Sequence, residues 1–367
     1  MKKLFTLAFM SLALTTVCAQ ETEQKKVEIP QWVNNFKFSG YGILQYQAED
    51  KRGGKHNEFN LRLARFILDG KIGDFDWRAQ IQGTNAKGPG EPTVQLVDLY
   101  AEWAKYKEAR IRVGQFKRAF TFESVTHPIT QGWYSYAMVI NNLVGYGDRT
   151  GEKSSGGRDI GIQLQGDLFP AADGHRWLHY QVGVYNGEGI NTKDKDNKKD
   201  IIGGMWVMPV KGVRFGAFGW TGTKAEMDMT TTLKDPKGDP IVNKLQSVRK
   251  KRFALSAEYD KDEFTFRSEY IYSKGWGTKE VLGEKADGWY VFGIVPVIKS
   301  KLHAKARYQC YRADKTMGSS KSMYEVGANY FFTPKLQMNV EYARVNDRTN
   351  VEKHNYNFVD VELAFKF

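Results

Sequence analysis

The final nine residues of the chain alternate between apolar and mostly charged side chains. In the segment 359–367, VDVELAFKF, each odd-numbered residue is apolar and three of the four even-numbered residues are charged. A period of two puts the apolar side chains on one face of a β-strand and the charged side chains on the other. Segments of about ten residues with the same alternation recur from Phe36 onward, and outside one loop no convincing helical period interrupts them. This pattern predicts a large antiparallel all-β fold.

The alternating segments, separated by turn residues, predict about sixteen strands. They span residues 36–47, 58–68, 75–83, 94–103, 110–116, 158–169, 177–185, 201–208, 213–220, 252–259, 264–272, 288–295, 302–311, 322–330, 336–344 and 356–367. A soluble sheet could show the same alternation, but a soluble protein seldom combines so many strands with so few helices.

The connections between these strands alternate in length. Short connections, such as 69–74, 209–212 and 331–335, follow even-numbered strands, and long polar connections, such as 117–157 and 221–251, follow odd-numbered strands. Short turns on one rim and long loops on the other are the layout of an outer-membrane barrel. A β-sandwich has no reason to keep this alternation. We therefore predict an all-β, transmembrane antiparallel β-barrel of about sixteen strands.

The first nineteen residues have the features of a secretory signal peptide. Two lysines precede an apolar run that ends at Leu14, and small residues close the segment at Ala19. The apolar run is too short for a membrane-spanning helix. We expect a signal peptide at 1–19, a flexible periplasmic leader at 20–35 and a single transmembrane β-barrel at 36–367.

The composition agrees with such a barrel. Without Lys2 and Lys3, the 54 basic residues become 52, which against 42 acidic residues gives a formal charge of +10. The mean hydropathy of −0.53 would usually indicate a soluble protein, but only alternate residues of a transmembrane strand face lipid. Cys310 would be the single remaining cysteine, so we expect no internal disulfide.

If the apolar positions face lipid, the basic side chains between them point into the pore. A lysine or arginine on the lipid face would cost roughly 2 to 4 kcal/mol near the bilayer middle, and rings of such residues in a pore favour anions. The predicted inward set is Arg62, Arg78, Arg110, Arg112, Arg267, Lys305 and Arg307. Alternatively, these basic residues pair with inward-facing acidic residues in neutral ladders, and the inner wall is then only a solvated polar surface. These acids are Asp98, Glu102, Asp159, Asp167, Glu258 and Glu269.

The third loop, at 117–157, is far longer than an ordinary connection and is therefore expected to be functional. It begins with Lys117 and Arg118 and carries an apolar centre from Trp133 to Val144. Such a centre is unfavourable in water. We predict that the loop folds back into the barrel and brings Lys117 and Arg118 to the narrowest point of an anion pathway. The alternative is a surface flap or a subunit contact.

Two segments resemble the phosphate-selective porin O and P family. Residues 110–123, RIRVGQFKRAFTFE, resemble the family's GQFK-x-x-F segment, and residues 61–70, LRLARFILDG, resemble its second-strand pattern R-x-x-R-x-x-x-x-G. This resemblance implies a sixteen-stranded barrel, usually a homotrimer, whose third loop enters each pore and whose basic residues attract anions. Ala119 stands where the family pattern often has proline, and the resemblance leaves phosphate itself open as the solute.

The residues support neither a cofactor nor a metal site. The six histidines are scattered without a His-x-x-His or Glu-x-x-His spacing, and nothing in the sequence pairs a nucleophile with a base. We therefore expect a protein that is not an enzyme.

The sequence predicts a porin in the outer membrane of a Gram-negative bacterium, through which small anionic solutes diffuse passively. Phosphate or polyphosphate is the narrower version of this prediction. Expected partners are outer-membrane lipid, small anions, a second and third copy of the chain, and the barrel-insertion machinery, which reads a terminal aromatic residue such as Phe367. No nucleic acid is expected. The alternative is a surface-exposed adhesin or structural barrel with an incidental pore.

Overall fold

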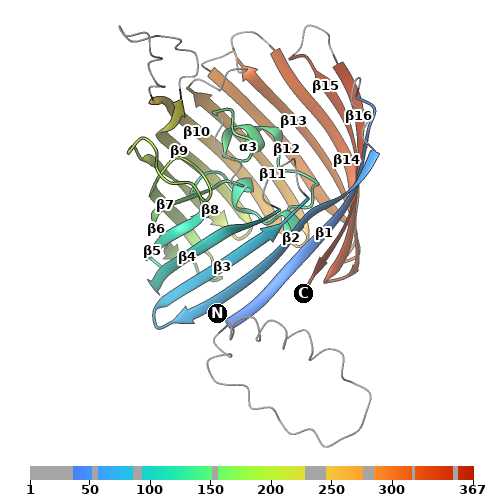
Figure 1. The fold of residues 1–367 in the computed structure, drawn as a ribbon. Helices are drawn as coiled ribbons and strands as arrows, with labels where there is room; N and C mark the ends of the chain where they lie inside the picture. The colour runs from blue at the N-terminus through green and yellow to red at the C-terminus, as the bar shows by residue number, and fades with distance from the viewer. Residues whose placement is uncertain are drawn as a thin grey trace, which may run out of the picture. The chain divides into compact units, whose positions relative to one another are not determined.

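Sixteen antiparallel strands close into a barrel in this computed structural model (Figure 1). Each strand pairs with its neighbours in the sequence, and β1 pairs with β16 to complete the ring. The structure describes residues 36–51, 57–85, 93–150, 156–227, 245–275, 285–315, 319–349 and 354–367. The predicted signal peptide at 1–19 and the predicted leader at 20–35 lie outside these residues.

All the predicted strands are present in the predicted order. They are β1 (Phe36–Glu49), β2 (Asn57–Ile72), β3 (Phe75–Gly83), β4 (Val94–Tyr106), β5 (Ala109–Lys117), β6 (Arg158–Pro170), β7 (Arg176–Tyr185), β8 (Asp200–Val210), β9 (Val213–Met227), β10 (Leu245–Lys261), β11 (Phe264–Lys274), β12 (Lys285–Ile298), β13 (Leu302–Asp314), β14 (Ser319–Thr333), β15 (Leu336–Asp347) and β16 (His354–Lys366). Between β5 and β6 lie the short helices η2 (Glu123–Val125), α2 (Pro128–Gln131) and α3 (Met138–Leu143). No helix in the described residues is long and apolar enough to cross a membrane.

The main difference from the predicted strand ends lies at β9 and β10. These strands continue to pair beyond the predicted boundary, as far as Met227 opposite Leu245. The sequence here is polar and lacks a clear alternation, so it predicts a loop for residues 221–251. Backbone pairing extends a hairpin without any such pattern, because the hydrogen bonds do not depend on the side chains.

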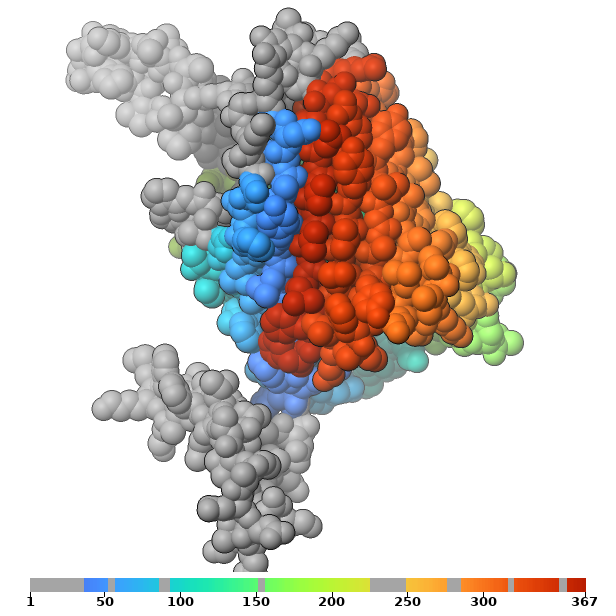
Figure 2. All heavy atoms as spheres, turned by 90° about the vertical axis from the view of Figure 1, so that its right-hand side faces the viewer, coloured from blue at the N-terminus to red at the C-terminus, as the bar shows by residue number. Residues whose placement is uncertain are grey.

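The two faces of the wall differ in chemistry. Large apolar side chains such as Leu99, Val113 and Phe215 are about half exposed on the outer face, while Glu102 and Arg267 are buried on the inner face. An apolar belt of this extent is expected where strands contact lipid. Figure 2 shows this outer surface where β1, in blue, adjoins β16, in red. The predicted alternation is therefore confirmed for most strands.

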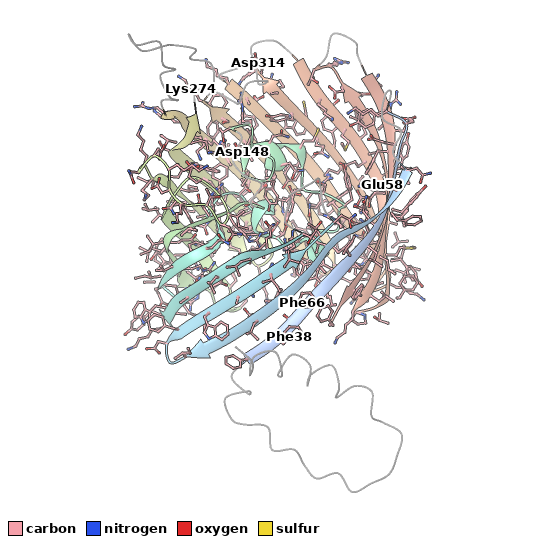
Figure 3. The ribbon with its side chains drawn as sticks, in the orientation of Figure 1. Phe38, Glu58, Phe66, Asp148, Lys274 and Asp314 are labelled. Carbon is pink, nitrogen blue, oxygen red and sulfur yellow. The ribbon has the colours of Figure 1, made fainter. Side chains whose placement is uncertain are left out.

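Aromatic side chains gather where the barrel closes. The ring of Phe367 lies 6.1 Å from that of Phe38 and 5.7 Å from that of Phe66, and Figure 3 shows Phe38 and Phe66 near the rim at which β1 begins. The backbones of Gly40 and Phe367 exchange hydrogen bonds of 3.1 and 3.0 Å. The terminal residue thus belongs to the closing seam in both its backbone and its side chain.

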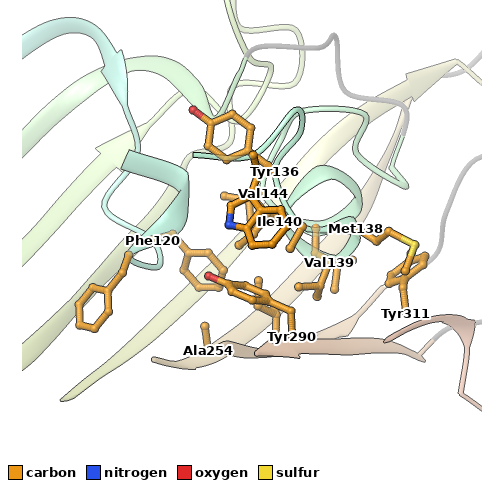
Figure 4. Packing of buried hydrophobic residues seen from close by; sticks show 14 of the residues in the cluster. Phe120, Tyr136, Met138, Val139, Ile140, Val144, Ala254, Tyr290 and Tyr311 are labelled. Atoms are coloured by element: carbon orange, nitrogen blue, oxygen red, sulfur yellow. The ribbon is translucent and has the colours of Figure 1, made fainter. Parts of the chain in front are cut away.

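The third-loop segment, defined here as residues 118–157, packs against inward-facing side chains of the wall. α3 contacts β11, β12 and β13. Val139 and Ile140 are fully buried in one cluster with Tyr290 and Ala254 of the wall (Figure 4). Burial of these side chains stabilises the segment by roughly 1.5 to 3 kcal/mol for each large one.

This packing corrects the predicted orientation of some apolar residues. The alternation predicts apolar residues on the lipid face, but Tyr290 and Phe292 face inward and are buried under the third-loop segment. Leu63, predicted to point outward beside Arg62, is buried in a cluster with Ile129 of α2. In each case the inner face is apolar because an apolar part of the third-loop segment covers it.

Gly114 provides a test of the wall beside β4. Its φ is 132°, and a Cβ at this position would lie 2.2 Å from the carbonyl oxygen of Leu99. We expect Gly114→Ala to lower the free energy of unfolding by roughly 1 to 3 kcal/mol, because both the backbone conformation and the strand contact must change. Unfolding by guanidinium in detergent micelles, followed by tryptophan fluorescence, measures this difference.

The matched control is Gly219→Ala in β9, where an added Cβ would meet no atom within 4 Å. This variant should unfold at nearly the same denaturant concentration as the unmodified protein. Equal midpoints for the Gly114 and Gly219 variants would contradict the assigned constraint at Gly114.

Candidate functional site

A cavity of about 240 Å³ lies on the inner side of β3 to β8, beside the start of the third-loop segment. We call it the basic cavity. Its cationic lining residues are Arg78, Arg112, Lys117, Arg118 and Arg158. Asp98 is the one carboxylate that lines it among the described residues. The lining is completed by aromatic, amide and histidine side chains, so the cavity is both basic and partly apolar.

The strand register explains why these side chains meet. Arg78 lies directly opposite Tyr100 across β3 and β4, and Arg112 lies opposite Gln163 across β5 and β6. Directly opposed residues on antiparallel strands point to the same side of the sheet. Inward positions of neighbouring strands therefore form one row along the inner wall, and the basic cavity lies against this row.

The arginines of the basic cavity are held by carboxylates. The pairs are Arg78–Asp69 at 2.7 Å, Arg112–Glu102 at 2.5 Å, Arg118–Asp159 at 3.1 Å and Arg158–Asp98 at 2.7 Å. These contacts match the ladders that the sequence left as an alternative. Each carboxylate fixes its guanidinium group and offsets part of its charge.

Lys117 differs from the arginines in its contacts. Its Nζ donates hydrogen bonds to the carbonyl oxygens of Ser124 at 2.7 Å and Thr126 at 2.6 Å, and it lies 3.4 Å from the hydroxyl of Tyr136. Within the described residues, its hydrogen bonds are therefore to neutral oxygens. Unlike the arginines, Lys117 is therefore held by neutral oxygens rather than by a carboxylate in this part of the structure.

His127 of the third-loop segment lines the basic cavity and reports its electrostatic potential. The pKa of His127 is lowered to about 3, with burial as the largest cause. The next causes are the positive charges of four neighbours, which are Lys117, Arg65, Arg78 and Arg158. His127 is therefore neutral at pH 7, because burial and these neighbouring cations both disfavour its charged form.

Two phenylalanines fix the start of the third-loop segment beside the basic cavity. The ring of Phe120 lies 5.5 Å from Trp220, and the ring of Phe122 lies 5.6 Å from Trp206, both edge-on. Thr121 between them has a φ of 66°, a strained conformation for a β-branched residue. Both rings thus pack on tryptophans of the inner wall on either side of this residue.

Ala119 stands where the porin O and P family pattern often has proline, and its backbone makes a contact that proline could not make. Its N–H donates a hydrogen bond of 3.3 Å to the hydroxyl of Tyr185. A proline has no N–H and could not make this contact. The alanine therefore adds a link between the third-loop segment and β7.

The structure brings four of the nine predicted site residues to the basic cavity, namely Arg78, Arg112, Lys117 and Arg118. The other five pair elsewhere on the inner wall: Arg62 with Glu362, Arg110 with Asp167, Arg267 with Glu258, Lys305 with Glu341, and Arg307 with Glu325. A role in an anion pathway remains a prediction for all nine.

Lys305 and Arg307 have a more definite structural position than the sequence indicates. Both side chains are fully buried, and their cationic groups lie 4.6 and 4.4 Å from the ring centre of Trp133. Lys305 donates to the carbonyl of Gly132, and Arg307 donates to the carbonyl of Ser135. They hold the third-loop segment against β13.

Arg158 and Arg65 were not predicted as site residues. Arg158 lies at the first position of β6, next to Asp159, and both are buried, so simple alternation assigns only one of them inward. Arg65 contacts Tyr41 and Gln82. The position of Arg65 in the family-like pattern at 61–70 was the sequence signal that could have identified it as a site residue. Nothing in the sequence marks His127 as a neighbour of these arginines.

A second anchor joins the end of the third-loop segment to β10. The carboxylate of Asp148 accepts two hydrogen bonds from Arg252, at 2.6 and 2.8 Å, and both side chains are fully buried. Burial alone would raise the pKa of Asp148, but Arg252 outweighs it and the pKa lies below its usual range. Arg252 also donates to the carbonyl of Leu143 at 2.7 Å.

No group of three or more His, Cys, Asp or Glu side chains in the described residues is arranged to hold a metal ion. The basic cavity is lined by cations, amides, histidines and aromatic rings, with Asp98 as its lining carboxylate among the described residues. The cations among these groups attract and orient anions.

The comparison with known proteins agrees with the family resemblance that the sequence shows. The family model for phosphate-selective porin O and P matches residues 39–209, which include both segments of the family resemblance. The resemblance is thereby confirmed. No curated protein matches the sequence.

Solved outer-membrane proteins share the fold at low identity. OprB of Pseudomonas putida, in a high-pH structure, has a TM-score of 0.63 and 9% identity over 92% of this chain and 95% of that chain. The outer membrane channel DcaP of Acinetobacter baumannii has a TM-score of 0.58 and 10% identity over 90% of this chain and 97% of that chain. The trimer form of in-vitro folded OmpT from Vibrio cholerae has a TM-score of 0.55 and 11% identity over 90% of this chain and 99% of that chain. With the family match, these likenesses confirm a sixteen-stranded barrel of the outer membrane.

The anchor at Asp148 predicts a local change in stability. Asp148→Asn leaves Arg252 buried without its carboxylate, and breaking a buried pair in this way costs about 3 to 5 kcal/mol. We expect faster hydrogen exchange at the backbone amides of residues 138–149, measured by mass spectrometry. The control is Asp76→Asn, whose exposed pair with Lys71 at 3.9 Å contributes about 0 to 1 kcal/mol. Equal exchange in both variants would contradict the anchor.

Glu123 predicts a dependence of the third-loop segment on pH. Burial raises the pKa of Glu123 to about 7 from an ordinary 4.5, although Arg307, 3.8 Å away, lowers it. The resulting stabilisation is complete below pH 4.5 and is lost as the pH rises through 7, because the native segment favours the protonated acid. Hydrogen exchange at residues 118–137 should therefore increase between pH 6 and 8, after correction for the intrinsic rate.

Glu123→Gln is the control for this pH dependence, because an amide keeps the size and polarity of the protonated acid without titrating. The variant should show a flat corrected exchange profile over the same range. A step of equal size in the variant would assign the dependence to another group.

Proposed function

We propose that this outer-membrane barrel is a porin through which small anionic solutes diffuse passively, and that it has no catalytic activity. The observation that carries the proposal is the basic cavity, which has five cationic side chains and one lining carboxylate. The family match and the shared fold of the outer membrane channel DcaP support the porin role.

The contacts in the basic cavity suit transient binding. A channel must bind an ion well enough for it to enter and weakly enough for it to leave. Each guanidinium group keeps its positive charge and attracts a passing anion, while its carboxylate partner lowers the net attraction. Lys117 is held by two carbonyl oxygens instead of a carboxylate. We assign attraction of the anion to Lys117, Arg78, Arg112 and Arg158.

The proposal includes a narrowing of the pore by the third-loop segment. It is supported by the packing of α3 on β11, β12 and β13 and by the anchors at Lys305, Arg307 and Arg252. Arg118, paired with Asp159 and fully buried, is assigned to positioning the start of this segment rather than to binding the solute.

Two narrower statements belong to the same proposal. Phosphate is a candidate solute, supported by the name of the matching family. A homotrimer is the proposed assembly, supported by that resemblance and by the trimer form of OmpT, which shares the fold.

Measurement in a planar bilayer tests the proposal. Under a salt gradient, the reversal potential of the purified protein should have the sign of anion preference. The double variant Lys117→Gln, Arg112→Gln should shift this potential toward zero, because two positive charges leave the cavity. Block of the chloride current by millimolar phosphate would support phosphate as the solute.

The control is Lys71→Gln, which removes an exposed lysine at the end of β2, outside the basic cavity. Its reversal potential should equal that of the unmodified protein. A cation-signed potential in the unmodified protein would refute the anion porin. Equal shifts in the control and the double variant would exclude the basic cavity as the selectivity site.

A further inference from the structure

The basic cavity has an apolar side that simple anion attraction does not require. Tyr100, Phe116 and Trp206 line it together with the cations. The rings of Tyr100 and Phe116 lie 6.0 Å apart, edge to face. The guanidinium carbon of Arg112 lies 4.4 Å from the ring centre of Tyr100. Planar groups thus border the same space as the positive charge.

A second planar pair lines the basic cavity from β7 and β8. The ring of His179 stacks on Trp206 at 3.8 Å with an angle of 11° between the planes. Nδ1 of His179 contacts Asp167 at 2.7 Å, and Nε2 is buried with no hydrogen-bond partner among the described residues. His179 itself lines the basic cavity beside Trp206.

The charge arrangement disfavours strongly hydrated dianions. Carboxylates of Asp69, Glu102 and Asp98 already occupy one side of Arg78, Arg112 and Arg158. An inorganic dianion would lose much of its hydration and would meet these negative charges. A monoanion needs less compensation, and an apolar body on it gains free energy by leaving water for the aromatic side.

The size of the basic cavity limits the solute. Its volume of about 240 Å³ lies below the roughly 300 to 1,000 Å³ of pockets for drug-sized ligands. A solute that carries one ring fits this limit. The carboxylate of such a solute would lie among the cations of the cavity, and its ring would lie against the aromatic lining.

We propose that the basic cavity selects small monocarboxylates that carry a planar apolar body, of the size of a single aromatic ring, over inorganic oxyanions and over aliphatic acids. This inference rests on the proposed anion porin, specifies its substrate class and competes with phosphate, the candidate solute that the family name suggests. Trp206, His179 and Tyr100 are its specificity-determining residues, and Lys117 with Arg112 supplies the charge.

The test compares how four anions block the chloride current of single channels: benzoate, cyclohexanecarboxylate, acetate and inorganic phosphate. Benzoate should block at about tenfold lower concentration than acetate, since one stacked ring pair contributes an affinity factor of this order. Cyclohexanecarboxylate, which is equally apolar but not planar, should fall between them. Phosphate should block no better than acetate.

Two variants assign the effect to the aromatic side. Trp206→Leu and Tyr100→Leu should each remove most of the preference for benzoate while the reversal potential keeps its anion sign. Since each residue is tested alone, a folding failure in one leaves the other informative. Trp289→Leu, which removes an exposed tryptophan of the outer face, is the matched control and should keep the preference.

The outcomes separate this inference from the proposed function. Anion-signed reversal with equal block by benzoate and acetate, or with the strongest block by phosphate, would overturn the substrate class and leave the anion porin intact. Cation-signed reversal would overturn both. Preference for benzoate that survives both cavity variants would place recognition elsewhere and overturn the assigned residues.

Discussion

The structure depends on the closure of its sheet. In lipid, a backbone N–H or C=O without a partner costs several kcal/mol, so a spanning sheet has to pair its first strand with its last. Here β1 and β16 pair from Tyr41 opposite Lys366 to Glu49 opposite Phe358. Once the ring is closed, the wall has a lipid side and an inner side. The side chains of each strand are distributed between these two sides.

Closure also determines what the interior can contain. Charged side chains enclosed by the wall are poorly solvated, and a buried charge is tolerated only when it is paired or hydrogen-bonded. The many arginine–carboxylate pairs of the inner wall meet this requirement. They also offset part of the positive charge of the interior. After burial, the neighbouring cations are the next causes that lower the pKa of His127.

The sequence predicts most of the fold because lipid imposes a simple rule on every strand. Strands such as β5 and β16 follow the rule and were predicted within a few residues. β12 does not, since Tyr290 and Phe292 contact Val139 and Trp133, far away in the chain, and no local pattern encodes such a contact. The candidate site was predicted in part for the same reason. Alternation places Arg78 and Arg112 inward, but it cannot show that they share a cavity with His127 or Trp206.

The pairing of interior charges has a consequence for how the barrel enters the membrane. Several pairs join strands that are neighbours in the sequence: Asp69 of β2 with Arg78 of β3, Glu102 of β4 with Arg112 of β5, and Glu325 of β14 with Arg307 of β13. Each such hairpin carries its own counter-charge before the ring exists. A β2–β3, β4–β5 or β13–β14 hairpin can therefore pair these arginines before other strands join, whereas Arg62 meets Glu362 of β16 only when the ring closes.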